Sequence, residues 1–242
     1  MGVLESLDNT AHRDIRIDGR LVEVLGARLN MVPVVLSEFL KLVVQYPIAF
    51  TKDKETGRFV CVALFGFHDG ENLFLEDGQW NAIYVPLHIS RQPFFLGNSA
   101  ENTADSDHYV VCIDVEHGSV RRDAGEPIFD ADGRETAYLE RMKECLAELL
   151  NGESPTQQFV ETLARLKLLL PMQLEITFEN QEATEVAGLY TIDETRLAAL
   201  SPEDITSLHA QHYLGPIYTM LASLGHIYRM VDQRNKRLAS PE

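Results

Sequence analysis

Residues 188–237 read GLYTIDETRLAALSPEDITSLHAQHYLGPIYTMLASLGHIYRMVDQRNKR, and this stretch decides the fold that we expect. Apolar side chains recur along its second half at alternating spacings of three and four residues, which places them in one stripe of a helix. The stripe consists of Leu214, Ile217, Leu221, Leu224, Tyr228 and Val231. At 1.5 Å of rise per residue, this helix would be roughly 35 Å long. We therefore predict one long C-terminal helix that begins near Tyr213 and acts as the spine of the domain.

Capping residues mark the starts of further helices upstream. Ser201, which precedes a proline, combines a hydroxyl cap with a proline in the first turn, and Ser154 repeats this pattern. Asp193 is an acidic cap at the end of a strand. We interpret Gly152 as the stop of a preceding helix over residues 138–150. The sequence thus predicts two separate helices, one on each side of Gly152.

Strand and turn signals dominate the first half of the chain. Residues 46–51 and 59–67 are rich in aromatic and β-branched side chains and flank a loop with a glycine, which is typical of a β-hairpin. Residues 92–96 and 109–113 repeat this pattern, as an internal duplication of the hairpin would. The connection between them, residues 97–108, is polar and acidic, and we expect a surface loop there.

The order of the elements, with strands first and helices later, predicts an α+β fold with a mostly antiparallel sheet. We expect Gly188 to mark a place where the sheet packs closely. No linker rich in Pro, Gly or Ser divides the chain, so we expect a single domain. Its predicted parts are an irregular N-terminal segment (1–30), a strand-rich part (46–135) and a helix-rich part (137–237) with one hairpin (172–192), all within residues 1–242.

Composition and charge limit the classes of function. With 21 basic and 37 acidic residues, the chain has a formal net charge of −16, which disfavours binding to nucleic acid. Its apolar runs are far shorter than the ~18 residues that a membrane-spanning helix needs. We see no secretory signal and expect a cytoplasmic protein that does not insert into membranes. Cys61, Cys112 and Cys145 lie far apart, and we expect buried free thiols in a reducing compartment.

No stretch of the sequence spells out a reaction. The motifs of nucleophilic hydrolases and of nucleotide-binding loops are missing, so we assign no catalytic residue and no cofactor. Asp130, Asp132 and Gly133 resemble a calcium loop only superficially, because the glycine comes too early, and we predict a plain turn. His209 and His212 would share a helix face, but no carboxylate or cysteine at ligand spacing accompanies them. We therefore assign no metal ligand.

The most suggestive cluster lies in the stretch QWNAIYVPLHISRQPFF, residues 79–95. It brings the only tryptophan, Trp80, within twelve residues of Tyr84, His88 and Arg91. Such a mixture can stack on an apolar side chain and pair with a carboxylate, so we take these four as candidate ligand-binding residues. In the alternative interpretation the aromatic rings belong to the core and Arg91 pairs with an acidic loop.

Three long blocks resemble the SapC family, in the same order and over most of the chain from residue 33 to residue 237. They are YPIAFTKDKETGRFVCVALFGFHDGENLF, YVPLHISRQPFFL and the stretch from Gly188 to Met230. The resemblance implies a bacterial cytoplasmic protein of a family named after an S-layer protein secretion locus. It also implies a setting beside cupin-like oxygenases, flavin-dependent halogenase-like proteins and TonB-dependent receptors. It transfers no catalytic residue.

Two classes of function remain. The first is a non-enzymatic peptide- or partner-binding module of a bacterial peptide-modification or secretion/transport system, or a scaffold within it. Its partner would be a peptide, an oxygenase- or halogenase-like enzyme, or a transport component. The second is a metal-dependent oxygenase-like enzyme, or the obligate partner of an oxygenase or halogenase. The missing catalytic motifs favour the first.

The enzyme hypothesis needs side chains from distant segments to converge on a metal ion. They are His12, His88, His209 and His212 with a carboxylate such as Asp14 or Asp114. The apolar stripe of the C-terminal helix also suits pairing with a second subunit, so a homodimer stays open beside packing on the chain's own sheet.

Overall fold

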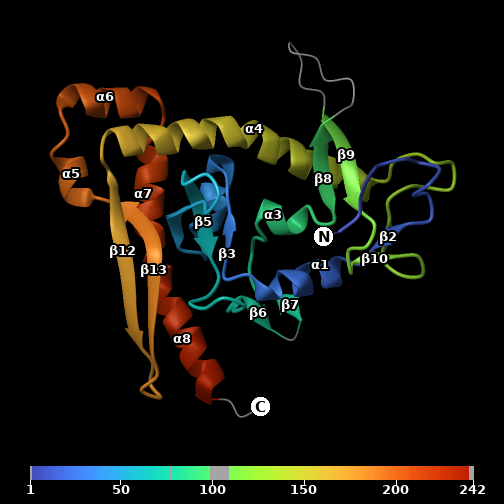
Figure 1. Cartoon of the computed structure of the whole chain (residues 1–242), viewed down its shortest axis with the longest axis horizontal. Helices are drawn as coiled ribbons and strands as arrows, with labels where there is room; N and C mark the ends of the chain where they lie inside the picture. The colour runs from blue at the N-terminus through green and yellow to red at the C-terminus, as the bar shows by residue number, and fades with distance from the viewer. Residues whose placement is uncertain (1, 77, 99–108, 240–242) are drawn as a thin grey trace. The chain divides into compact units, whose positions relative to one another are not determined.

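The computed structural model describes residues 2–76, 78–98 and 109–239 (Figure 1). The predicted α+β class is confirmed, since antiparallel sheets come mostly from the first half and helices from the second. The chain divides into two compact units, which are described separately. The first unit is Met1–Ala27, Leu75–Trp80 and Leu87–Leu150, and the second is Arg28–Phe74, Asn81–Pro86 and Asn151–Glu242. The interpretation of the whole chain as one domain stays a prediction.

A five-stranded antiparallel sheet forms the centre of the second unit, with the strand order β12-β13-β4-β5-β3. β4 (Ile48–Lys52) and β5 (Phe59–Leu64) form the predicted hairpin, and β3 (Met31–Pro33) pairs with the other side of β5. Asp53 closes the turn of the hairpin, because its carboxylate accepts hydrogen bonds from the backbone N–H and the hydroxyl of Thr56 (2.8 and 2.7 Å). The turn residues that predicted this hairpin from the sequence thus form the hydrogen bonds that close its turn.

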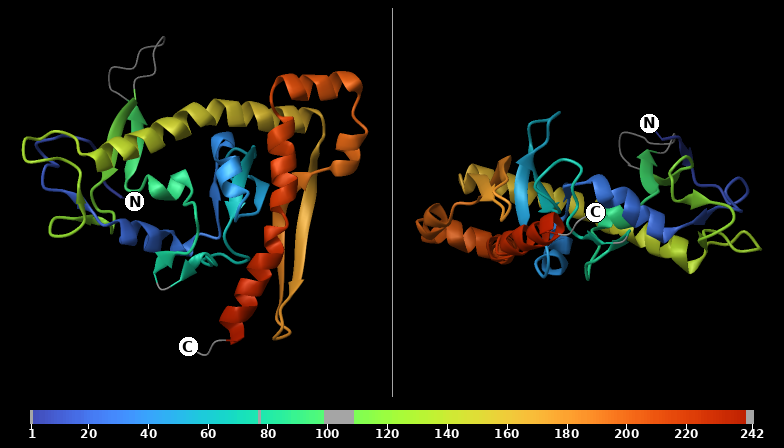
Figure 2. Two further views of the ribbon diagram at one scale, coloured as in Figure 1. Left: turned by 180° about the vertical axis from the view of Figure 1, so that it is seen from behind. Right: turned by 90° about the horizontal axis from the view of Figure 1, so that it is seen from below.

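The predicted late hairpin is also present, as β12 (Leu169–Thr177) and β13 (Ala183–Ile192). In both views of Figure 2 it lies alongside the C-terminal helices. Its register shifts between Met172 and Leu174, where β13 contains an extra residue. Gly188 lies at this bulge with φ of +79°, and a Cβ atom there would meet nothing within 4 Å. The prediction that Gly188 marks close packing is thus wrong, because the left-handed backbone requires the glycine.

An aromatic cluster joins helices to this sheet. Phe159 of α4 (Ala137–Arg165) is at its centre, with its ring centroid 6.3 Å from that of Phe39, 6.4 Å from that of Phe50 and 5.2 Å from that of Tyr213. All four rings are buried. Aromatic pairs at such distances add to the stabilisation that burial alone provides.

The helix α4 runs without interruption through Gly152 and Pro155, so the prediction of two helices is wrong. A tertiary contact explains the glycine, since a Cβ atom on Gly152 would lie 2.7 Å from the Cβ of Val35. The hydroxyl of Thr156 donates to the carbonyl of Gly152 (2.6 Å) and accepts from the backbone N–H of the residue after Val35 (2.9 Å). These contacts hold the helix in place where local signals indicated an end.

The C-terminal spine is a long bent helix made of α7 (Leu214–Ser223) and α8 (His226–Ala239), as predicted apart from the break between them. The buried hydroxyl of Ser223 accepts from the backbone N–H of Ile48 (2.8 Å) and donates to the carbonyl of Met220 (2.6 Å). These hydrogen bonds link the end of α7 to the first residue of β4.

The break changes which side chains of the spine are buried. Ile217, Met220 and Met230 are buried, whereas Tyr228 is 82% exposed. At 100° per residue an unbroken helix would place Ile217 and Met230 on different faces, so the break resets the helical phase. The prediction of Tyr228 in the apolar stripe is wrong for this reason.

Two charged side chains fasten α8 to the loop after β5. Arg234 lies 3.2 Å from the carboxylate of Glu71, and Arg237 donates to the carbonyls of Asn72 (2.9 Å) and Leu73 (3.0 Å). The carboxylate of Glu71 also accepts the backbone N–H of the residue Phe67 (2.7 Å). The basic end of the spine thus packs on its own unit.

The predicted caps of the two short helices before the spine are confirmed. Asp193 caps α5 (Glu194–Ala198) and accepts the N–H of Arg196 at 2.9 Å. Ser201 caps α6 (Pro202–Ala210), and its hydroxyl accepts from the backbone N–H of the third residue of that helix at 3.1 Å. Both satisfy N–H groups that a helix start leaves without an internal partner.

The first unit contains two three-stranded antiparallel sheets, with the strand orders β1-β9-β8 and β10-β2-β11, and the small pair β6-β7. The bounds of its elements are β1 Leu4–Ser6, β2 Arg16–Ile17, α1 Gly19–Leu25, β6 Leu75–Glu76, β7 Gln79–Trp80, α3 Leu87–Ser90, β8 Phe94–Asn98, β9 Tyr109–Asp114, β10 Val120–Arg121 and β11 Glu126–Pro127. The described part of residues 1–30, predicted as irregular, thus contains two strands, the helix α1 and a short 3-10 helix (Gly26–Arg28). The second predicted hairpin is confirmed as β8-β9, and residues 99–108 of its predicted loop lie outside the described residues.

The core of the first unit lies between its sheets and the first half of α4. Leu139, Met142 and Leu146 of α4 are buried there with Phe94 of β8 and Ile113 of β9. Burial of such side chains is the main favourable contribution to folding. Among the described residues, no helix is both long enough and apolar enough to cross a membrane.

The three cysteines are free thiols, as predicted, but only Cys61 is buried as expected, whereas Cys112 and Cys145 are partly exposed. Cys61 lies in β5, Cys112 in β9 and Cys145 in α4. Burial raises the pKa of the Cys61 thiol far above its ordinary value, so this thiol stays protonated.

Candidate functional site

Trp80, the first of the four predicted ligand-binding residues, belongs to the core of the first unit. It is the last residue of β7 and only 8% exposed. Its backbone N–H donates to the carboxylate of Glu23 in α1 (2.9 Å). A Cβ atom on Gly26 would lie 3.0 Å from the indole ring, so the ring packs directly against the end of α1. This position matches the structural alternative for the tryptophan.

His88 and Arg91 lie together at α3 in the first unit. Burial, and then the charge of Arg91, lower the pKa of His88 to about 4, so its imidazole is neutral near pH 7. The guanidinium of Arg91 donates to the carbonyl of Phe94 (2.7 Å) and lies over the ring of Phe95, 4.3 Å from its centroid. Arg91 thus fixes the start of β8. Residues 99–108 of the acidic loop lie outside the described residues, so its pairing with Arg91 stays a prediction.

Tyr84 belongs to the second unit, where several side chains hold it. Its hydroxyl donates to the buried carboxylate of Glu38 (2.9 Å), and its carbonyl accepts from the hydroxyl of Tyr46 (2.7 Å). The ammonium of Lys41 lies 5.3 Å from the centroid of its ring. The structure thus brings His88 and Arg91 together in the first unit. Trp80 belongs to the core of the same unit, whereas Tyr84 belongs to the second unit. A shared recognition surface of these four residues stays a prediction.

The histidines of the enzyme hypothesis are divided between the units, with His12 and His88 in the first and His209 and His212 in the second. His12 is buried; its Nδ1 accepts the backbone N–H of Asp8 (3.0 Å) and its Nε2 lies 3.1 Å from the carboxylate of Glu5. Both ring nitrogens therefore have protein partners. In the part of the chain that the structure describes, no three His, Cys, Asp or Glu side chains form a group that could hold a metal ion.

The predicted plain turn at residues 130–133 is confirmed. The carboxylate of Asp130 accepts the backbone N–H groups of Asp132 (2.8 Å) and Arg134 (2.9 Å). These bonds, that of Arg134 first, lower the pKa of Asp130. The turn leads into α4 and lies beside the edge of the strand β9.

One stretch of the edge of β9 is open. In the sheet β1-β9-β8, β1 pairs with β9 only from Leu4 to Ser6, opposite Asp114 to Cys112. One more bond follows, from the N–H of Leu7 to the carbonyl of Val111 (2.8 Å), and then the N-terminal chain turns away. Among the described residues, the rest of β9 has only β8 as a neighbouring strand.

The register shows which backbone groups are left open. The N–H of Asp114 donates to the carbonyl of Pro93 at 3.0 Å, so the residues at even positions of β9 bond to β8. Because the bonding side alternates along a strand, Tyr109 and Val111 face away from β8. Among the described residues, the N–H of Val111 and both backbone groups of Tyr109 have no hydrogen-bond partner on that side.

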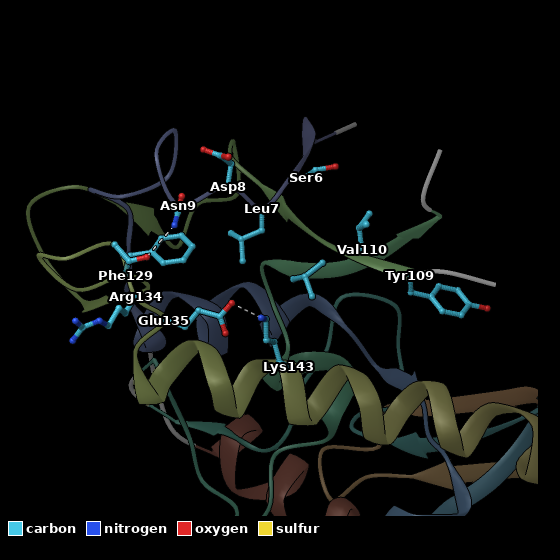
Figure 3. Close-up of a pocket in the computed structure, with 12 residues that line it drawn as sticks. Ser6, Leu7, Asp8, Asn9, Tyr109, Val110, Phe129, Arg134, Glu135 and Lys143 are labelled. Carbon is cyan, nitrogen blue, oxygen red and sulfur yellow. Dashed lines mark hydrogen bonds and ion pairs between the residues drawn. The ribbon is translucent and has the colours of Figure 1, made fainter. Parts of the chain in front are cut away.

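A pocket of about 630 Å³ lies against this open edge, within the first unit. It is bounded by the departing segment from Ser6 to Asn9, by the β9 residues, by Phe129 with the following turn, and by Lys143 of α4. Figure 3 shows the side chains of Leu7, Phe129, Glu135 and Lys143 pointing toward the same space. Leu7 and Phe129 belong to the core cluster and its border, so the floor is apolar.

The rim of the pocket carries charges of both signs. Glu135 and Lys143 form an ion pair across it, and each side chain is about 40% exposed. Asn9 donates to the carbonyl of Gly133 (3.2 Å), which closes one end. Exposed ion pairs contribute roughly 0–1 kcal/mol, so Glu135 and Lys143 can exchange partners at small cost when a ligand binds. The arrangement combines backbone donors, an apolar floor and adaptable charges.

Sequence reasoning did not find this pocket. The segment 6–9 has no clear period, and the end of a strand that is only three residues long leaves no mark in the sequence. The likeness of residues 109–113 to residues 59–63 predicted a strand but not which of its edges stays open. The pairing of residues about a hundred positions apart was the missing information.

Comparisons with known proteins agree with the resemblance noted in the sequence. No curated protein and no solved structure matches the chain. The sequence model of one family, described as SapC, matches residues 7–230, nearly the whole chain. The chain therefore belongs to the SapC family.

Proposed function

We propose that this chain is a non-enzymatic module that binds an extended peptide segment in a bacterial peptide-modification or secretion/transport system. The segment comes from a peptide or from a protein partner, such as an oxygenase- or halogenase-like enzyme or a transport component. The observation that carries the proposal is the open edge of β9 beside the pocket of Figure 3.

The chemistry of an open strand edge favours a peptide. Tyr109 offers its N–H and its carbonyl, and Val111 offers its N–H, at the spacing of a β-ladder with which an added strand would pair. Alternate side chains of the added strand then point to one side, at the spacing at which pockets confer specificity. A volume of about 630 Å³ falls in the range of ligand pockets, and its apolar floor with a few charges suits one or two side chains.

The wider system is proposed from family membership. The resemblance implies a setting of peptide or small-molecule modification and transport, and a peptide-binding module fits such a setting. The affinity of one added strand is modest, because ordering an extended peptide offsets much of the gain. A module of this kind would deliver or hold a peptide while another protein acts on it.

A matched pair of variants tests the proposal. Peptides that bind the purified protein are first selected from a displayed library of extended segments, and their affinities are measured by calorimetry. Tyr109→Pro removes the ring and the open N–H of residue 109, whereas Tyr109→Ala removes the ring alone. Because this N–H faces away from β8, the proline leaves the β8-β9 ladder intact.

We expect Tyr109→Pro to bind a selected peptide about tenfold more weakly than Tyr109→Ala, which corresponds to the loss of one hydrogen bond. His209→Ala, in the second unit, serves as a control and should bind like the unaltered protein. Equal affinities of the two Tyr109 variants, or a library that yields no binder, would contradict the proposal.

A further inference from the structure

Four arginines gather in one part of the first unit, although the protein as a whole is strongly acidic with a net charge of −16. Arg13 and Arg16 lie just before and in β2, and Arg121 and Arg122 lie at the end of β10. β2 and β10 are paired strands, so the two segments lie side by side. The cluster is an exception to the charge distribution that the composition indicates.

The register places two of these charges directly opposite each other. Arg16 of β2 is the partner of Arg121 of β10. Like charges at opposed positions of neighbouring strands destabilise a sheet. Arg121 is partly compensated by the carboxylate of Asp123 at 3.3 Å, and Arg16 donates to the carbonyl of Gly125 at 3.0 Å. The opposed charges are nevertheless a local conflict in the sheet, and such conflicts are typical of functional sites.

A pocket of about 560 Å³ lies at the cluster, lined by Arg13, Arg16 and Arg122 with Asp14, Phe129 and Asp130 among its other residues. Three guanidinium groups face two carboxylates, so one positive charge is left uncompensated. Both backbone N–H groups of the turn bond to Oδ1 of Asp130, and the charges of Arg134 and Arg13 also act on this carboxylate. Among the described residues, the side chains of Arg13 and Arg122 have no hydrogen bond and no ion pair.

We propose that this pocket binds a carboxylate group, namely an acidic side chain or the C-terminal carboxylate of the peptide that occupies the pocket at β9. This inference depends on the proposed function. The two pockets adjoin, because Phe129 lines both. Arginine pairs with a carboxylate through two parallel hydrogen bonds. One uncompensated positive charge matches one carboxylate, whereas a phosphate group brings about −1.5 to −2 at pH 7.

The first arm of the test uses no peptide but glutarate, which carries a single charge on each of two separate carboxylates, so that one of them can enter the pocket. Glutarate is titrated into the full chain while the side-chain Nε–H signals of the arginines are followed by NMR. We expect saturable shifts for Arg13, Arg16 and Arg122. Arg122→Glu should weaken binding at least tenfold, whereas Arg20→Glu, which changes an exposed arginine of the same unit outside the pocket, should leave it unchanged. Arg122→Lys should bind at an intermediate level, because the point charge remains and the two-bond geometry is lost.

Linear, unsaturable shifts, or equal effects of Arg122→Glu and Arg20→Glu, would overturn the anion site. Arg122 is exposed, so a normal melting temperature for Arg122→Glu is expected and verifies that the variant is folded. Inorganic phosphate is titrated in parallel. If it saturates the same signals at a tenfold lower concentration than glutarate, the assignment to a carboxylate is wrong.

The second arm uses the selected peptide and a copy in which each carboxylate is replaced by an amide. We expect at least tenfold weaker binding of the amide copy to the unaltered protein and no difference between the copies for Arg122→Glu. If both copies bind the unaltered protein equally and Tyr109→Pro still weakens them, the inference fails and the proposed function stands. If glutarate binds but no peptide does, the proposed function fails and the assignment to a peptide carboxylate fails with it.

Discussion

Glu38 and Tyr84 show how a buried carboxyl group is accommodated in the second unit. Glu38 is completely buried, and its two carboxylate oxygens accept from the backbone N–H of Val35 (3.1 Å) and from the hydroxyl of Tyr84 (2.9 Å). A carboxylate away from water is tolerated only when hydrogen-bond donors replace the water. This contact gives Tyr84 a structural role that its place in a mixed aromatic and basic stretch did not indicate.

Replacing Tyr84 with phenylalanine tests this role. The variant keeps the ring and removes the donor to Glu38, so we expect the free energy of unfolding to fall by about 1–3 kcal/mol. Urea denaturation measures the change. Tyr228→Phe is the matched control, because Tyr228 is 82% exposed and should change stability by less than about 0.5 kcal/mol. Equal losses in the two variants would show that the hydroxyl of Tyr84 is not needed.

His88 makes the stability of the first unit depend on pH. Its pKa is lowered to about 4 from an ordinary value of 6.5. As the pH falls below 6.5 the unfolded chain takes up a proton that the folded chain does not, so stability is full above this pH and is lost toward pH 4. The loss at pH 4 amounts to about 3 kcal/mol.

The variant His88→Gln cannot titrate, so its stability should fall less steeply than that of the unaltered protein between pH 6.5 and pH 4. Denaturation curves at several pH values measure the two slopes. His209→Gln, at an exposed position, should keep the slope of the unaltered protein. A slope that His88→Gln leaves unchanged would rule out a neutral, partly buried imidazole.

At the scale of secondary-structure elements, the helix α4 shows where local signals lose to tertiary packing. Its sequence contains a glycine and a proline that usually end helices, yet Ala137–Arg165 is one helix. Gly152 is present because Val35 approaches the helix closely. Helix propensity is a weak preference, and packing of this kind overrides it.

Replacing Gly152 with alanine should therefore destabilise the protein, although alanine favours helices by about 1 kcal/mol. The added Cβ atom would lie 2.7 Å from that of Val35, and such overpacking costs about 1–3 kcal/mol. Thermal unfolding measures the change. Gly215→Ala in α7 is the control, since its Cβ atom meets nothing within 4 Å and should be neutral or stabilising. A Gly152→Ala protein as stable as this control would contradict the close contact.

The same comparison explains how much the sequence could predict. The hairpins were recognisable because their turn residues, such as Asp53, act locally. Which face of α8 is buried was not recognisable from the sequence, because the bend after Ser223 depends on a contact with Ile48. The pocket at β9 was out of reach for a similar reason, since it exists only where β1 stops pairing with a strand far along the chain. Of the predicted site, His88 and Arg91 lie together, and Trp80 was better explained as core.

At the scale of the whole molecule, family membership does not identify a ligand, whereas the distribution of charge limits which ligands are possible. Membership in the SapC family covers residues 7–230 and identifies no reaction. The net charge of −16 argues against polyanions as ligands, while the arginine cluster of the first unit leaves room for a single carboxylate. A peptide that adds a strand to β9 and carries one acidic group is not a polyanion and supplies the single carboxylate.

The central claim is that the open edge of β9 pairs with a peptide, and amide hydrogen exchange measured by NMR tests it most directly. With a selected peptide at saturation, we predict that exchange at Tyr109 and Val111 slows at least tenfold. The N–H of Cys112 already faces β8, so its exchange should not change. If Tyr109 and Val111 exchange equally fast with and without the bound peptide, the peptide lies elsewhere and the account is contradicted.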